Sequence, residues 1–295
     1  MKLAVTLNDE TTLEQLLETE VDTIIIGYEN LSHRMKVTYD IETIKGLVNK
    51  VKSHQKSVWI NMNIIMHDDH IEAAQDALSD LKELDIDGIL FADLAVYVLS
   101  ESFGLTNKLI YYPETYTTSR IDAEFWKHEK IQSIVLAREL TLKDVLEISI
   151  DAPLPITLVG HGYLNMFHSR RPLVENFFKY TEEENPDSIK NSKKLTIVEE
   201  QRDESYKIVQ DAFGTHIFRA KPLASFSVLE QIKPHIDTLI IDTLFLEQHT
   251  FDLINDYYVA LNSKSYEAII EKYKETHDDG FYFKKTILNK KGEIL

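Results

Sequence analysis

The chain has 295 residues, of which 43% are hydrophobic and 10% aromatic, enough to bury a sizeable core. Its formal net charge of −17 argues against broad electrostatic binding of nucleic acid, which needs clustered lysine and arginine. The absence of cysteine excludes disulfides, a thiol nucleophile and any cysteine-held zinc or iron–sulfur centre in this chain.

We expect neither a targeting segment nor a membrane span in this sequence. The N-terminus, MKLAVTLNDETTL, becomes acidic within ten residues, which argues against a signal peptide. No apolar run approaches the roughly 20 residues that span a membrane. We therefore expect a cytoplasmic protein that does not associate with a membrane.

Short apolar runs alternate with helical patterns along most of the chain. Strands are predicted over residues 3–6, 22–27, 57–64, 87–91, 109–112, 133–137, 155–159 and 237–241. Helices are predicted to begin at residue 11 and to cover residues 41–53, 68–84, 95–103, 122–128, 141–148, 225–232 and 265–276. Because strands and helices alternate, the strands are expected to be parallel. Seven such units in a row favour an α/β fold of the (β/α)8 TIM-barrel type over an open sheet.

The alternation breaks after Arg171. Residues 182–194 are polar and predict an exposed loop, and residues 195–201 and 206–209 predict a hairpin, followed by a turn and a segment at 216–220. We therefore expect one barrel domain over residues 1–295. It carries a small irregular hairpin insertion after the seventh strand, at 173–215, and an aromatic and basic tail at 277–295.

Polar side chains gather where the predicted strands end. In a barrel, the carboxyl ends of the strands share one mouth, where ligands bind. The strongest signal lies at residues 155–172, where a buried strand reaches a predicted tight turn at Gly160-His161-Gly162. The polar residues at strand ends are Asn61, Asn63, Asp93, Arg138, Glu139, His161 and Asp242.

Several of these residues have two interpretations. His161 either hydrogen-bonds the turn backbone or binds an anion or carbonyl at the mouth, with binding favoured over catalysis. Asp93 and Asp242 suit acid–base chemistry or metal binding, although capping a helix or accepting loop amides is the commoner role. His67-Asp-Asp-His70 looks like a metal cluster, but capping of the next helix explains its aspartates, and no metal site is predicted.

These segments resemble the bacterial U32 proteins, long labelled peptidases. Residues 136–142 (LARELTL) are similar to the family's L-A-R-E-L-(S/T)-L segment, and His161-Gly162 with Ser169 and Arg171 resembles the signature H-G-x-x-C-x-x-Y-S-G-R-C. The further matches are Gly27, Ser32-x-Arg34, Asn61 and Asp93.

The signature's cysteines are replaced here. Asn165 and Pro172 stand in their places, and a later Cys-Arg pair reads Gln201-Arg202. In cysteine-bearing members these thiols hold an iron–sulfur cluster. The resemblance therefore implies no cofactor of that kind in this chain.

Residues 202–218 and 278–285 are similar to the shorter of two paired U32 proteins that are implicated in forming 5-hydroxyuridine at the tRNA wobble position, with prephenate linked to the reaction. This resemblance implies a helper role beside a larger cysteine-bearing homologue, which would hold the iron–sulfur cluster. It also implies a prephenate-derived donor and tRNA contacted through the complex. The sequence leaves open whether the chain also forms a homodimer.

A cationic mouth would suit a donor that carries two carboxylates, because arginine can bind a carboxylate with two hydrogen bonds. His161, Asp93 and Asp242 are the catalytic candidates, with no role assigned. The candidate substrate-binding residues are Arg34, Asn61, Arg138, Glu139, His161, Arg170, Arg171, Arg202 and His216.

Two other functions are considered. A peptidase finds little support, because the chain has no H-E-x-x-H, no G-x-S-x-G and no acid assignable to a triad with Ser169. A non-catalytic scaffold barrel would stabilise its partner without using the mouth. Whether the chain is itself an enzyme is left open.

Overall fold

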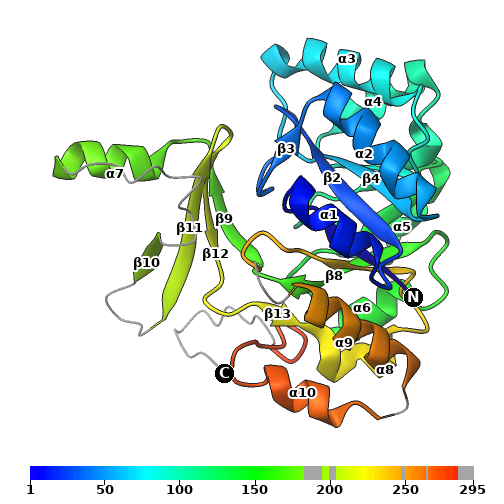
Figure 1. Cartoon of the computed structure of the whole chain (residues 1–295), viewed down its shortest axis with the longest axis vertical. Coiled ribbons are helices and arrows are strands. Elements are labelled where there is room, and N and C mark those ends of the chain that lie inside the picture. Colours follow the sequence, from blue (N-terminus) through cyan, green and yellow to red (C-terminus); the bar gives the residue numbers. More distant parts are fainter. Residues whose placement is uncertain (183–194, 199–203, 247–249, 264, 285–295) are drawn as a thin grey trace.

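The computed structural model describes residues 1–182, 195–198, 204–246, 250–263 and 265–284. Within these residues, eight parallel strands close into a barrel (Figure 1). This confirms the predicted TIM-barrel-like fold. Around the barrel, the strands are β1 (Lys2–Thr6), β2 (Thr23–Tyr28), β4 (Ser57–Met62), β5 (Gly88–Phe91), β6 (Leu109–Tyr111), β7 (Ser133–Val135), β8 (Ile156–Gly162) and β14 (Thr238–Ile241), which pairs with β1 again.

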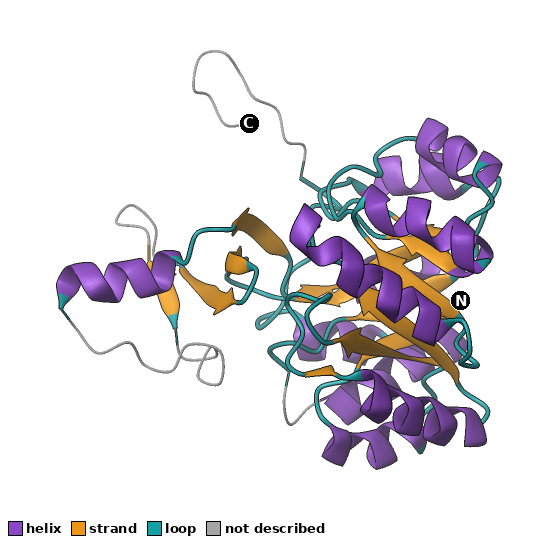
Figure 2. Cartoon of the chain, turned by 90° about the horizontal axis from the view of Figure 1, so that it is seen from above, coloured by secondary structure: helices purple, strands orange, loops and turns teal. Residues whose placement is uncertain are grey.

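Helices cover the outside of the barrel (Figure 2). They bury one apolar face, as in α2, where Ile44, Leu47, Val48 and Val51 follow the helical repeat. No helix in the described ranges is both long and apolar enough to cross a membrane. The helices of the barrel are α1 (Glu10–Leu17), α2 (Ile41–Ser53), α3 (Ile71–Leu81), α4 (Leu94–Phe103), α5 (Arg120–His128), α6 (Leu142–Ser149), α8 (Leu229–Ile232), α9 (Thr250–Asn262) and α10 (Glu267–Tyr273).

Short elements complete the barrel. β3 (Thr38–Tyr39) extends β2, and β13 (Leu223–Ala224) pairs antiparallel with the end of β8. Three 3-10 turns are η1 (Asp68–His70), η2 (Thr106–Lys108) and η3 (Ser225–Val228). The barrel strands are buried at nearly every position, because helices cover their outer face and side chains fill the inside.

A second unit lies between β8 and β13, and we call its described residues the insertion. Its four-stranded antiparallel sheet has the order β10-β11-β12-β9, and it projects to one side of the barrel (Figures 1 and 2). The side chain of Gln210 accepts the N–H groups of Val174 and Glu175, which holds the start of the insertion's helix on the sheet. Its elements are β9 (Asn165–Ser169), α7 (Leu173–Thr181), β10 (Thr196–Val198), β11 (Ser205–Asp211) and β12 (Gly214–Phe218).

The insertion differs from the prediction in extent. A hairpin does follow the seventh strand, but it belongs to a larger and more regular unit that already begins with β9. Position 214 requires glycine, because a Cβ there would lie 2.0 Å from the Ser169 carbonyl oxygen. Its φ of +131° is also a backbone conformation that suits glycine. The predicted loop at 182–194 lies outside the described residues except for Glu182.

One further prediction needs correction, and one helix was missed. The turn at Gly160-His161-Gly162 is the end of β8, because β13 pairs with His161 and Gly162 and keeps the backbone extended. Helix α9 was not predicted, although Leu253, Ile254, Tyr257 and Ala260 have helical spacing.

Tyr257 of α9 ties this helix to β8. Its hydroxyl donates to the Gly160 carbonyl oxygen at 2.9 Å and accepts the Ser225 N–H at 3.1 Å. Tyr257→Phe leaves both buried groups without this partner, so we expect the free energy of unfolding to fall by about 1–3 kcal/mol in urea titrations. Tyr258→Phe, on the exposed side of α9, serves as the control and should change nothing. Equal unfolding midpoints for both variants would contradict this role.

Candidate functional site

An ion triad lies at the mouth, where β2, β6 and β7 end. One oxygen of the Glu114 carboxylate accepts hydrogen bonds from the Nη2 atoms of both Arg34 and Arg138. All three side chains are largely buried, at 6%, 13% and 7% exposed for Arg34, Glu114 and Arg138. Because one carboxylate faces two guanidinium groups, the triad keeps an excess of positive charge.

The backbone around the triad holds these side chains in place. Arg34 and Glu114 have positive φ values of 55° and 69°, which turn the chain sharply after their strands. The Arg138 N–H donates to the Glu114 carbonyl oxygen at 3.1 Å, and its Nη2 donates to the Tyr112 hydroxyl at 2.9 Å. Burial and the nearby charge of Arg138 lower the pKa of Arg34 to about 9, so its guanidinium is still charged at neutral pH.

The insertion contributes a carboxylate to the same mouth. Asp211 Oδ2, at the end of β11, accepts the Arg34 N–H at 3.2 Å and His216 Nε2 at 3.1 Å, and Oδ1 accepts the Phe213 N–H at 2.8 Å. Burial opposes ionisation of Asp211, but these hydrogen bonds outweigh it and hold its pKa below the ordinary value. Burial also lowers the pKa of His216. Asp211 is therefore a carboxylate that accepts from a neutral imidazole.

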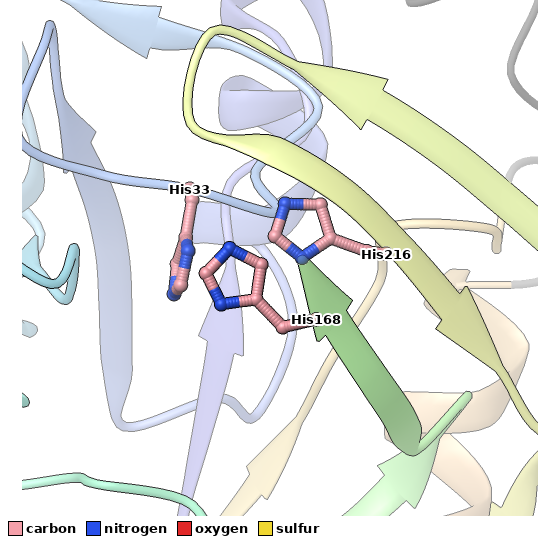
Figure 3. A group of neighbouring side chains, drawn as sticks. All are labelled: His33, His168 and His216. Carbon is pink, nitrogen blue, oxygen red and sulfur yellow. The ribbon is translucent and has the colours of Figure 1, made fainter. Parts of the chain in front are cut away.

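Three histidine rings meet beside Asp211 (Figure 3). His33 comes from the loop after β2, His168 from β9 and His216 from β12. Ring centroids are 5.5 Å apart for His33 and His168, 5.2 Å for His33 and His216, and 4.7 Å for His168 and His216. The barrel loop and the insertion thus share one cluster.

A small cavity of about 20 Å³ opens under the triad. It has room for about one water molecule. Asn61 Oδ1 and Arg138 Nε are buried in this region without a hydrogen-bond partner, and burial raises the pKa of Asp242 at the cavity wall. Unpaired donors and acceptors are costly in a protein interior, so the site suits a polar occupant. The polar lining residues are Thr6, His33, Arg34, Asn61, Asn63, Tyr112, Glu114, Arg138 and Asp242.

The structure brings some of the candidate residues together and separates others. Arg34, Asn61, Arg138 and Asp242 line the cavity. His216 is linked to Arg34 through Asp211, whose carboxylate accepts hydrogen bonds from both residues. That these residues bind substrate stays a prediction. The remaining candidates lie elsewhere: Glu139, Arg170 and Arg171 are exposed, and Arg202 is outside the described residues.

Asp93 has a helix-capping role. Its carboxylate accepts the Ala95 N–H at the start of α4 and the Met66 N–H, both at 2.9 Å. The commoner of its two interpretations, a helix cap, therefore accounts for its hydrogen bonds. At the other predicted cluster, His70 Nδ1 accepts the His67 N–H at 3.0 Å across the 3-10 turn η1.

His161 does not face the mouth. Its fully buried ring packs against Tyr257, Tyr273, Phe226 and His277 under α9 and α10, and Nδ1 is 3.2 Å from the Tyr257 hydroxyl. Burial, followed by the charge of His277, lowers its pKa well below the ordinary value. The predicted place of His161 at the mouth is corrected because it sits within β8 and points toward the helical layer.

Sequence reasoning missed several residues of the mouth. Glu114 and Tyr112 follow β6, so the strand-end rule that selected Arg138 would also have selected them. Asp211, His33 and His168 carry no such signal, because their meeting depends on how the insertion folds back over the barrel.

Comparison with known proteins places the chain in a family. Residues 8–290 match the family model described as Peptidase family U32. The chain belongs to peptidase family U32.

The proteins similar to this chain differ in how much of their own length matches it. It is 26% identical to tRNA hydroxylation protein P2 of Bacillus subtilis (strain 168), over 97% of this chain and 98% of that protein. It is 22% identical to tRNA hydroxylation protein P1 of the same organism, over 52% of this chain but 37% of P1. The solved structure described as "The Structure of the U32 Peptidase Mk0906" is 13% identical, with a TM-score of 0.49 over 82% of this chain and 92% of that one.

Glu114 is predicted to stabilise the mouth of this U32 protein. Glu114→Gln removes the negative charge between two buried guanidinium groups, so we expect a loss of about 3–5 kcal/mol in the free energy of unfolding, measured in urea. Glu124→Gln is the matched control, because its pair with Arg120 lies at 3.7 Å on an exposed helix face. A loss for Glu114→Gln no larger than that of the control would show that the triad is not held by this charge.

Proposed function

We propose that this chain acts in tRNA hydroxylation, as the shorter of two U32 proteins that together form 5-hydroxyuridine at the wobble position. The observation that carries this proposal is the similarity to protein P2 over nearly the full length of both chains. The match to P1 spans a smaller share of P1 than of this chain, so P1 is the longer protein. A shorter and a longer tRNA hydroxylation protein in one organism support the paired arrangement.

In this proposal, the longer partner supplies the redox centre. This chain has no cysteine, so it has no thiolate to hold an iron–sulfur cluster. The role left to it is to bind and position a small donor or the partner. tRNA would reach the complex mainly through other surfaces, because this chain carries a formal net charge of −17.

The mouth supports binding of a carboxylate donor such as a prephenate-derived compound. Arg34 and Arg138 share the single carboxylate of Glu114, and Arg138 Nε is unpaired. A ligand carboxylate can take the place of Glu114 on either guanidinium group with two hydrogen bonds. Since the cavity holds only about 20 Å³, entry of such a donor requires the triad to open.

The insertion offers a surface for the partner. Large apolar side chains are exposed on β9 and α7, and the insertion stands away from the barrel (Figure 2). Aromatic side chains and methionine are enriched in protein interfaces. The residues concerned are Met166, Phe167, Leu173, Phe177 and Tyr180.

The peptidase alternative gains no support from the described residues. Ser169 Oγ accepts the Arg171 N–H at 3.3 Å, and His168 Nε2 lies 3.3 Å from the Phe213 carbonyl oxygen. His161 packs under α9 and α10 instead of beside Ser169. No serine–histidine–acid arrangement is formed by these residues.

Nucleoside mass spectrometry of tRNA tests the proposal. A strain lacking this gene, and any second hydroxylation route, should lose 5-hydroxyuridine derivatives and regain them with the wild-type gene. The Arg138→Gln variant should restore at most about one tenth of the wild-type amount of 5-hydroxyuridine derivatives, because a charge-assisted contact with the donor carboxylate is lost. Arg120→Gln, on the exposed face of α5, should restore the full amount.

Equal protein levels of the variants, checked by immunoblot, are required for this comparison. Full restoration by Arg138→Gln would leave the chain as a scaffold for its partner. Unchanged wobble uridines in the deletion strain would overturn the tRNA proposal itself.

A further inference from the structure

The His33, His168 and His216 cluster has the composition of a metal site. One ring nitrogen of each histidine lies within 4.8 Å of the corresponding nitrogen of the other two. The rings come from three segments and face one another (Figure 3). His33 and His216 are 5% and 0% exposed, whereas His168 is partly exposed.

The hydrogen bonds of the cluster fix where the free lone pairs are. The Asp211 carboxylate oxygen lies 3.1 Å from His216 Nε2 and accepts its proton in this hydrogen bond, which leaves Nδ1 of His216 to offer a lone pair. The Phe213 carbonyl oxygen, 3.3 Å from His168 Nε2, also only accepts, so Nε2 carries the proton of this hydrogen bond and Nδ1 is the nitrogen that can offer a lone pair to a metal ion. His216 Nδ1 and His33 Nδ1 are buried and have no hydrogen-bond partner.

We propose that His33, His168 and His216 bind one divalent first-row transition metal ion, with Asp211 and the Phe213 carbonyl orienting two of the imidazoles. Neutral imidazoles suit Zn²⁺, Co²⁺, Ni²⁺ and Fe²⁺, and three of them leave a coordination position for water or substrate. Metal-bound histidines usually donate their other N–H to a carboxylate or carbonyl, which is the arrangement around His216 and His168.

Binding requires a defined movement. Nitrogens at about 2.0–2.1 Å from a tetrahedral zinc ion lie about 3.4 Å apart. The three histidine nitrogens lie within 4.8 Å of one another, so the cluster must contract around the ion. The rings of His168 and His216 are nearly parallel, at 8°, whereas His33 is perpendicular to both. His168 must therefore turn out of the stack, and its partial exposure on β9 gives it room to do so.

Charged groups near the histidine cluster act on a bound metal ion in opposite directions. The guanidinium groups of Arg34 and Arg138 lie in the same mouth and repel a metal ion. The Asp211 carboxylate, bound directly to His216, offsets them. This balance predicts that Asp211 contributes to metal affinity without touching the ion.

Metal titration of the purified full-length chain tests the proposal. After chelator treatment, Co²⁺ should bind at one equivalent and give visible ligand-field absorption, and Zn²⁺ should displace it. His168→Gln and His216→Gln should abolish this signal. Asp211→Asn should weaken binding by about 10- to 100-fold, as expected for a residue that orients a ligand.

His128→Gln and His67→Gln are controls, because they remove histidines outside the cluster and should bind as the wild type does. Circular dichroism should show that every variant is folded. His168→Gln is the decisive variant, since the partly exposed ring is tolerant of substitution. Absence of stoichiometric Co²⁺ binding, or binding unaffected by His168→Gln, would overturn the proposal and leave the three rings as a packing cluster.

Discussion

The carboxylate of Asp211 is the interaction on which the candidate site depends. It accepts hydrogen bonds from the backbone of Arg34 in the barrel, and from His216 and Phe213 in the insertion. A buried carboxylate is stable only when such donors satisfy it, so the barrel loop and the insertion hold each other in place. Asp211 thereby places a charged group of the insertion at the barrel mouth beside Arg34.

The mouth contains two chemically different groups of side chains next to each other. On one side, Arg34 and Arg138 surround Glu114 and favour an anion. On the other side, the nitrogens of three histidine rings can offer lone pairs to a cation. Asp211 lies between them, bonded to the Arg34 backbone and to the His216 ring. An anionic donor held at the arginines would lie beside a metal ion held at the histidines, and this arrangement links the two proposals spatially.

The barrel was predictable from the sequence, whereas the site was predictable only in part. Apolar runs followed by helical patterns reveal local structure, so the eight strands and the mouth positions of Asn61, Arg138 and Asp242 could be derived. Arg34 was a candidate through the family resemblance. His161 was misplaced because glycines at a strand end suggest a turn, and only the pairing with β13 extends the strand. The histidine cluster could not be derived, because its members meet through the tertiary fold of the insertion.

Hydrogen–deuterium exchange at the Arg34 amide tests most directly whether Asp211 joins the insertion to the barrel. In Asp211→Ala, peptides that contain Arg34 should exchange about tenfold faster or more than in the wild type, because their N–H loses a charged acceptor. Peptides from β4 should exchange at an unchanged rate and show that the barrel is intact. An Arg34 amide that exchanges equally fast in both proteins would contradict the account.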